Sequence, residues 1–296
     1  MGIASGNGRI EATEVDIATK LAGRLDAVLV QEGDMVAAGQ VLARMATREL
    51  QAQRRNAMAE TRRAEQEKCY AAAMIDQCRS ELALAEKELE RSRSLYEGKC
   101  IPLQTLQRQE TTVQSAQAAL VAAKARLANA AASIDAVKAK TDEIQSYIDD
   151  STLTAPLNGR VLYRLAEPGE VLAAGGRVLT LLDITDVYMT IFLPTQQAGK
   201  VDIGTEARIL LDALPDRPIP ARVSFVDSKA QFTPKEVETR TEREKLMFRI
   251  KVKIDPQLLK AHAEKVKTGL PGVAYLRLDP DLAWPQTLQN PLGEVN

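Results

Sequence analysis

Hydrophobic residues recur at every seventh position over the long stretch from Thr47 to Asp150. In its second half, one row is Leu106, Val113, Leu120, Leu127, Ile134 and Ile148, broken only by Thr141, and a companion row is Ala116, Ala123, Ala130, Val137 and Ile144. In its first half, the rows are Ile75, Leu82, Leu89 and Tyr96, and Ala71, Cys78 and Ala85, after a weaker start with Arg54, Thr61 and Lys68. Two such rows form the seam between paired helices.

Helix-breaking residues divide this stretch once. Gly98 and Pro102 are its only glycine and proline, and they lie near its midpoint. The sequence therefore predicts an antiparallel coiled-coil hairpin over 47–150 with its tip near 97–102. Each arm of about 50 residues would extend roughly 75 Å at 1.5 Å per residue. The alternative, two helices of a globular bundle, is disfavoured because the stretch lacks phenylalanine and tryptophan, the bulky residues that fill bundle cores.

The segments on either side of this hairpin repeat one another. The matched positions are Gly23 and Gly159, Arg24 and Arg160, Leu29 and Leu165, Gly33 and Gly169, and Ala37-Ala38-Gly39 and Ala173-Ala174-Gly175. One inserted residue near Gly176 then aligns Val41-Leu42 with Val178-Leu179. So many matches at a fixed offset indicate an internal repeat.

Each copy of the repeat is predicted to contain short strands separated by glycine turns. The turn glycines are Gly23, Gly33, Gly39, Gly159, Gly169 and Gly175. Because one copy is too small to bury a core, the copies at 9–46 and 151–182 must pack together as one split domain. The helical hairpin is then an insertion whose two ends lie side by side.

Alternating apolar and polar residues between 183 and 279 predict a small antiparallel β-barrel. The expected strands are Val187–Leu193, Glu206–Leu211, Ala221–Val226, Leu246–Ile254 and Gly272–Leu278, with short helices over 194–200 and 256–267. Three prolines at 280, 285 and 291 suggest that 280–296 is a flexible tail. The predicted fold class is therefore α+β multidomain.

Composition excludes several classes of protein. Thirty-nine basic and 40 acidic residues give a net charge of −1, so no bulk attraction to nucleic acid is expected. The low aromatic content of 4% agrees with a long alanine-rich hairpin. No apolar window is long enough to span a bilayer and no signal peptide precedes the first strand, so we expect that an anchor or signal segment is absent from this chain.

Few residues here could perform chemistry. Cys69, Cys78 and Cys100 form no C-x-x-C pair, so we interpret them as small residues in or beside the helical seam, without a disulfide or metal site. The single histidine, His262, lies among Lys260, Glu264, Lys265 and Lys267 and is interpreted as a solvated helix residue. No nucleotide-binding or hydrolase motif appears, so we expect no catalytic site, no metal and no cofactor, and the chain is not expected to be an enzyme.

At this point the chain resembles the membrane fusion proteins, or periplasmic adaptors, of HlyD-type secretion and efflux systems. The resemblance covers nearly the whole chain: a lipoyl-like (barrel-sandwich hybrid) domain split by a helical hairpin and followed by a β-barrel. Gly23–Leu42 is similar to the family's first half-motif and Leu153–Val161 to its second. Residues 231–239 and 242–252 resemble the barrel of adaptors that serve ABC-type exporters.

The resemblance implies a set of partners and a location. Such adaptors bridge an inner-membrane transporter, here of the ABC type, to a TolC-like outer-membrane channel in a tripartite efflux pump or type I secretion system. They assemble from several copies, and we expect a hexamer. The implied location is the periplasm, with attachment to the inner membrane.

The resemblance also points to residues at the hairpin tip. Many members carry an arginine, a leucine four residues later and a hydrophobic-serine pair beyond the turn. Arg91, Leu95 and Ile101 fit this pattern, whereas Pro102 stands where serine is usual. These residues could dock on the channel. Alternatively, Arg91 is a solvated helix residue and the other three staple the turn.

Two other functions remain possible from the sequence. A lipoyl or biotin carrier protein would present a lysine between the two repeat copies, but the junction at Ala43–Arg48 contains none. A coiled-coil scaffold is favoured by the free cysteines, yet it does not explain the split repeat.

Overall fold

The computed structural model describes residues 2–229, 247–263, 266–289 and 291–292. Its contacts divide the chain into two units, Met1–Met45 with Thr152–Asn296, and Ala46–Ser151. Two apolar cores lie among the strands of the first unit and another lies between the helices of the second. Each unit therefore has a core of its own.

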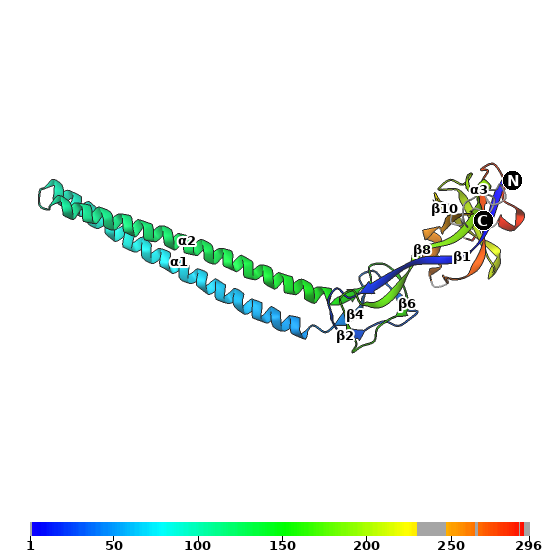
Figure 1. Cartoon of the computed structure of the whole chain (residues 1–296), viewed down its shortest axis with the longest axis horizontal. Coiled ribbons are helices and arrows are strands. Elements are labelled where there is room, and N and C mark those ends of the chain that lie inside the picture. Colours follow the sequence, from blue (N-terminus) through cyan, green and yellow to red (C-terminus); the bar gives the residue numbers. More distant parts are fainter. Residues whose placement is uncertain (1, 230–246, 264–265, 290, 293–296) are drawn as a thin grey trace, which may run out of the picture. The chain divides into compact units, whose positions relative to one another are not determined.

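The second unit is the predicted helical hairpin. Helix α1 (Arg48–Glu97) and helix α2 (Leu103–Asp150) run side by side in opposite directions (Figure 1). At 50 residues, α1 is about 75 Å long. The buried side chains are Ala57, Ala71, Ile75, Cys78, Ala85 and Leu89 of α1 and Ala123, Ala130, Ile134 and Ile144 of α2. All of them except Ala57 lie on the rows found in the sequence, so the predicted seam is confirmed.

Three polar side chains in the seam form hydrogen bonds, although Nε of Arg54 is buried without a partner among the described residues. The guanidinium of Arg54 donates to Oε1 of Gln145 on the opposite helix over 2.5 Å. The hydroxyl groups of Thr61 and Thr141 donate to backbone carbonyls one turn earlier in their own helices. The predicted seam breaks down at Lys68 and Tyr96, which are both exposed.

The first unit contains a small split domain built from both copies of the repeat. Its strands are β2 (Gly23–Val28), β3 (Met35–Val36), β4 (Val41–Met45), β5 (Thr152–Thr154), β6 (Gly159–Arg164) and β7 (Val171–Leu172), with parts of β1 (Ile3–Ala18) and β8 (Arg177–Pro194). Strands of the first copy pair with strands of the second, β2 with β7, β3 with β6 and β4 with β5. The two copies therefore form one domain, as the repeat predicted.

Backbone hydrogen bonds between the copies are reciprocal. The N–H of Gly33 donates to the carbonyl of Val161 (2.9 Å), and the equivalent N–H of Gly169 donates to the carbonyl of Leu25 (2.7 Å). The same symmetry relates the bonds of Leu25 to Glu170 and Val161 to Asp34, and those of Gly39 to Ala155 and Gly175 to Thr19. Each copy thus satisfies backbone groups that the other would leave unpaired.

The glycines of the repeat do not all serve as turns. Gly33, Gly39, Gly169 and Gly175 adopt positive φ between 80° and 97°. Gly159 instead begins β6, where a Cβ atom would lie 2.5 Å from the carbonyl oxygen of Leu182. Gly23 likewise begins a strand, β2, and has neither constraint, so both Gly23 and Gly159 lie at strand starts next to the predicted turns.

The two ends of the helical insertion leave adjacent strands. Ala43 of β4 lies opposite Leu153 of β5, and Arg44 lies opposite Thr152. Only a few residues separate these strands from the helices. The split domain therefore holds both ends of the insertion together.

The rest of the first unit is a closed six-stranded antiparallel barrel in the order β1, β12 (Pro271–Arg277), β9 (Glu206–Leu211), β10 (Leu214–Val226), β11 (Met247–Ile254) and β8. Pairing of β1 with β8 closes it, as in Gly8 opposite Ile191. Short helices α3 (Thr195–Ala198) and α5 (Pro256–Ala261) lie in two connections, each shorter than predicted. The split domain, the helical hairpin and this barrel together confirm the predicted fold class.

Two boundaries differ from the sequence prediction. The barrel does not begin at 183, because β1 pairs with β12 from Ile3 onward and with β8 up to Ala18. The apolar positions of β1 change from even-numbered up to Ala12 to odd-numbered from Val15, and this change marks the point at which β1 leaves the barrel for the split domain. The described part of the tail, which was predicted to be flexible, is packed: it includes the short helix η2 (Gln286–Leu288) and the buried side chains of Trp284 and Leu288. The predicted start of the strand at Leu246 lies outside the described residues.

Candidate functional site

The hairpin tip is a helix-ending turn in which a lysine takes the conformation usual for glycine. The N–H of Cys100 donates to the carbonyl of Leu95 and that of Lys99 to Tyr96, both over 2.8 Å. This is the hydrogen-bond pattern of a Schellman motif. Lys99 adopts φ of 59°, whereas Gly98 has φ of −73°. Pro102 then precedes the first residue of α2 in an extended conformation.

Lys99→Gly should stabilise the hairpin by about 1 kcal/mol, because a left-handed residue with a Cβ atom costs about that much. Gly98→Ala is the matched variant, and it should not destabilise, since alanine accepts φ near −73° and meets only ordinary contacts there. Urea unfolding followed by helical circular dichroism would measure both. Destabilisation by Lys99→Gly would contradict this account of the turn.

The tip presents apolar side chains to solvent. Arg91 and Leu95 lie four residues apart on one side of α1, and both are exposed, Leu95 by 42%. Ile101 is half-buried and Pro102 is exposed. The sequence analysis missed Leu103, which is 50% exposed at the start of α2. These residues share one end of the hairpin, and the apolar ones are more exposed than turn packing alone would require.

The outward side of α2 carries small uncharged residues. Exposed alanines recur at intervals of three, four or seven, at Ala118, Ala122, Ala125, Ala132, Ala136 and Ala139. Val121 beside them is 62% exposed. A surface of this kind allows another helix to approach closely. The sequence signal, a third row of small residues outside the seam, was present but not used.

The cysteines are free thiols. Cys78 is buried in the hairpin seam as predicted, whereas Cys69 and Cys100 are exposed. In the part of the chain that the structure describes, no cluster of histidine, cysteine and acidic residues is placed to hold a metal ion. His262 is half-buried at the end of α5, and its solvated assignment therefore needs correction.

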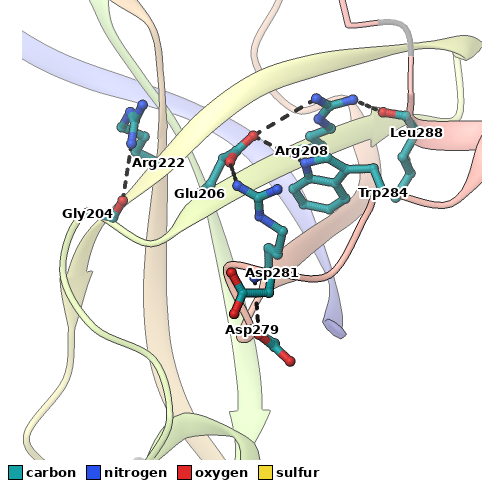
Figure 2. Close-up of polar contacts among 9 residues, drawn as sticks. Gly204, Glu206, Arg208, Arg222, Asp279, Asp281, Trp284 and Leu288 are labelled. Atoms are coloured by element: carbon teal, nitrogen blue, oxygen red, sulfur yellow. Dashed lines mark hydrogen bonds and ion pairs between the residues drawn. The ribbon is translucent and has the colours of Figure 1, made fainter. Parts of the chain in front are cut away.

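A cluster of charged groups fastens the tail to the barrel (Figure 2). The ring of Trp284 lies 4.8 Å from the guanidinium carbon of Arg208 and 5.6 Å from that of Arg277. Its Nε1–H donates to Glu206 over 3.2 Å. Glu206 also pairs with both arginines, and Arg208 donates to the carbonyl of Leu288. The sequence signal was the only tryptophan of the chain, placed in a segment assigned as flexible.

A second charged group joins β1, β8 and β11. The carboxylate of Asp186 accepts from Nζ of Lys253 and from the hydroxyl of Thr13, each over 2.6 Å. The hydrogen bond from Lys253, followed by that from Thr13, holds the pKa of Asp186 below its ordinary value of 3.8. Thr13 lies at a register shift of β1, so this group fixes the point where β1 leaves the barrel.

The lowered pKa of Asp186 predicts a pH dependence of stability. Its contribution should be complete above about pH 4, the unfolded pKa, and disappear as the pH falls through the lower folded pKa. Asp186→Asn should cost about 1 kcal/mol at pH 7, because the site is partly solvated, and should flatten the loss of stability below pH 4. Urea unfolding at several pH values would test this. Lys253→Met should have a similar effect, and the double variant should be less than additive.

The chain is similar in sequence to a described family and to several bacterial membrane proteins. Residues 13–183 match the family model described as the CzcB-like barrel-sandwich hybrid domain, which is more than half of the chain. The chain belongs to this family. It is 29% identical over 290 residues to a UPF0194 membrane protein of Yersinia pseudotuberculosis, covering 89% of this chain and 86% of the relative. A UPF0194 membrane protein of Citrobacter koseri is 29% identical over 271 residues, covering 83% and 81%.

Solved structures show the same fold. MacA from Actinobacillus actinomycetemcomitans superposes with a TM-score of 0.64 at 16% identity, over 93% of this chain and 78% of MacA. The membrane fusion protein Spr0693 of Streptococcus pneumoniae gives a TM-score of 0.50 at 16% identity, over 92% and 97%. The resemblance to membrane fusion proteins and periplasmic adaptors is therefore confirmed. Among the helices of the described ranges, none has the length and apolar character required to cross a bilayer.

Proposed function

We propose that this chain is a non-enzymatic periplasmic adaptor that bridges an inner-membrane transporter to an outer-membrane channel for efflux or type I secretion. The observation that carries this proposal is the split domain, in which paired β4 and β5 hold both ends of a hairpin about 75 Å long. A hairpin of this length separates its tip from the two helix ends by about 75 Å. The family and the fold support the same role.

The hairpin tip is the proposed docking site for the channel. Leu95 and Ile101 would seat between helical ends of a TolC-like channel, and Arg91 would pair with its carboxylates or carbonyl groups. Pro102 is the extended residue directly before α2, and its ring restricts the backbone that positions Ile101. Exposure of Leu95 leaves an apolar side chain available for this contact, whereas exposure of Arg91 agrees both with docking and with a solvated helix residue.

Site-specific photo-crosslinking in bacterial envelopes would test the docking proposal. A photoreactive residue in place of Leu95 should form a crosslink to an outer-membrane channel, identified by mass spectrometry. The same residue in place of Val121, which is exposed far from the tip, is the matched control and should not. Absence of any channel among the products at Leu95 would contradict docking at the tip.

Arg91→Glu in that crosslinking background should reduce the yield at least fivefold, because it replaces a charge-assisted contact with repulsion. Arg126→Glu, an exposed change on α2 away from the tip, controls for the altered net charge. An unchanged yield with Arg91→Glu would remove Arg91 from the contact, while the crosslink at Leu95 would still support the adaptor role.

The transporter is proposed to be of the ABC type, and the assembly to contain six copies. The first proposal rests on the resemblance of residues 231–239 and 242–252, of which 247–252 lie within the described residues. The second is supported by the small-residue side of α2, on which a neighbouring hairpin could pack. An ATPase and a permease encoded beside this gene, together with sedimentation of the purified protein as a hexamer, would support them. A permease of another class, or a strict monomer, would contradict them.

A further inference from the structure

The barrel contains a cavity that the adaptor role does not use. Its volume is about 270 Å³, and it lies where β9 runs into β10 and β11 runs into α5. Val187, Ile219 and Ile254 form its inner wall, and Leu258 and Leu259 of α5 cover it. Protein interiors rarely leave voids of this size empty. Ligand pockets usually have volumes of about 300 Å³ or more, and this cavity is close to that lower limit. Its size therefore suits one small apolar group.

The mouth of this cavity is positively charged. Arg217 and Lys267 line it and are both exposed, and His262 lies beside them. The described lining residues include no carboxylate. Some other cations of the barrel are paired with carboxylates, as Lys253 is with Asp186 and Arg277 with Glu206. In the described ranges neither Arg217 nor Lys267 forms an ion pair, so both can meet an anion from solution.

One wall of the cavity is fixed from the split domain. The guanidinium of Arg160 on β6 donates to the carbonyls of Val266 (3.0 Å) and Ala263 (3.4 Å). Val266 lines the cavity beside Lys267. The shape of the mouth is therefore held in place before any ligand arrives, which lowers the cost of binding.

We propose that this cavity binds a medium-chain fatty-acid anion, with the alkyl chain inside the barrel and the carboxylate at Arg217 and Lys267. A methylene group takes about the ~30 Å³ of a liquid water molecule, so 270 Å³ accommodates a chain of about nine methylene groups. A lipid with two acyl chains does not fit this volume. The proposal is independent of the adaptor function, because it requires neither the hairpin tip nor a partner protein.

Isothermal titration of the full chain with octanoate, decanoate and dodecanoate, each below its micelle concentration, would test the chain-length limit. Affinity should rise about fourfold per buried methylene group from octanoate to decanoate, with one ligand per chain, and then level off when the cavity is full. Decanol has the same chain without the charge and should bind about tenfold more weakly than decanoate. Binding that does not saturate, or that keeps rising with chain length, would overturn the proposal.

Variants of the cavity separate its charged and apolar parts. The double variant Arg217→Gln/Lys267→Gln should weaken decanoate about tenfold and leave decanol unchanged. Lys260→Gln removes one charge from α5 without lining the cavity and should have no effect. Leu214→Asp places a carboxylate on an exposed lining residue, which folding should tolerate, and should weaken decanoate more than tenfold. Unchanged decanoate affinity in both the double variant and Leu214→Asp would overturn the proposal.

Discussion

Gly8→Ala should destabilise the barrel by about 3 kcal/mol, although alanine is normally the better residue in a strand. Propensity alone favours alanine over glycine by roughly 0.5–1 kcal/mol. At Gly8, however, a Cβ atom would lie 2.3 Å from the carbonyl oxygen of Thr190 and 2.8 Å from Cγ of Met189. Strand β1 pairs with both β12 and β8 at this point, so neither neighbour can move away without opening the barrel. The overpacking cost should therefore exceed the gain in propensity.

A loss of stability in Gly8→Ala would show that overpacking outweighs strand propensity, and a gain would show the reverse. Asn7→Ala is the matched control, because Asn7 is the adjacent residue of β1 and is exposed. It should change the free energy of unfolding by less than about 0.5 kcal/mol. Urea unfolding of both variants gives the comparison. A Gly8→Ala variant as stable as the parent chain would show that β1 and β8 do not close the barrel as described.

Trp284→Ala should cost about 3–5 kcal/mol, the range for removing a buried aromatic side chain. Trp284 is 7% exposed, and the guanidinium carbons of Arg208 and Arg277 lie 4.8 and 5.6 Å from the centroid of its ring. Its removal takes away two cation–π contacts and the N–H that donates to Glu206. Arg208, itself 8% exposed, would then remain in a partly vacated site. The loss should appear both in the free energy of unfolding and in protease cleavage of the tail.

The tail offers a close control for this variant. Leu282→Ala removes an exposed apolar side chain two residues earlier and should cost less than about 1 kcal/mol. Because Trp284 is the only tryptophan, acrylamide quenching of the parent chain reports directly on docking of the tail. Strong quenching in the native chain, or equal stability of Trp284→Ala, would contradict a packed tail.

The helical hairpin was predictable because its information is local and periodic. The rows through Leu120 and Ala123 lie in the seam, and the single break at Gly98 and Pro102 marks the tip. The detail of the turn was not predictable, since the glycine does not occupy the left-handed position that Lys99 takes. Glycine prefers positive φ only as a statistical tendency. The hydrogen bonds from Lys99 to Tyr96 and from Cys100 to Leu95 place Lys99, and not Gly98, at the left-handed position.

The split domain was predictable for a different reason, namely that a repeat must find its partner copy. In the structure the two copies pair through reciprocal hydrogen bonds, from Gly33 to Val161 and from Gly169 to Leu25. The membership of β1 in two substructures was not predicted, although its apolar alternation changes phase between Ala12 and Val15, where its pairing register shifts. A strand that turns the other set of side chains inward after an irregularity can belong to two cores.

The candidate sites were less accessible from the sequence than the fold. Grouping of Glu206, Arg208 and Trp284 depends on strands and a tail that are distant along the chain. The same is true of Arg217 and Lys267 at the cavity mouth. Only the tip residues, which are close in the sequence, could be proposed together, and their role in docking remains a prediction.

Amide hydrogen exchange of the full chain tests most directly that the two repeat copies form one cooperative domain. The N–H groups of Leu25 and Gly33 in one copy, and of Val161 and Gly169 in the other, are hydrogen-bonded across the pairing. They should share one opening free energy, and Leu25→Ala, which removes a fully buried side chain, should lower protection in both copies equally. Exchange at least about 100-fold faster in one copy than in the other would contradict a single cooperative domain. A loss of protection confined to the first copy in Leu25→Ala would contradict it as well.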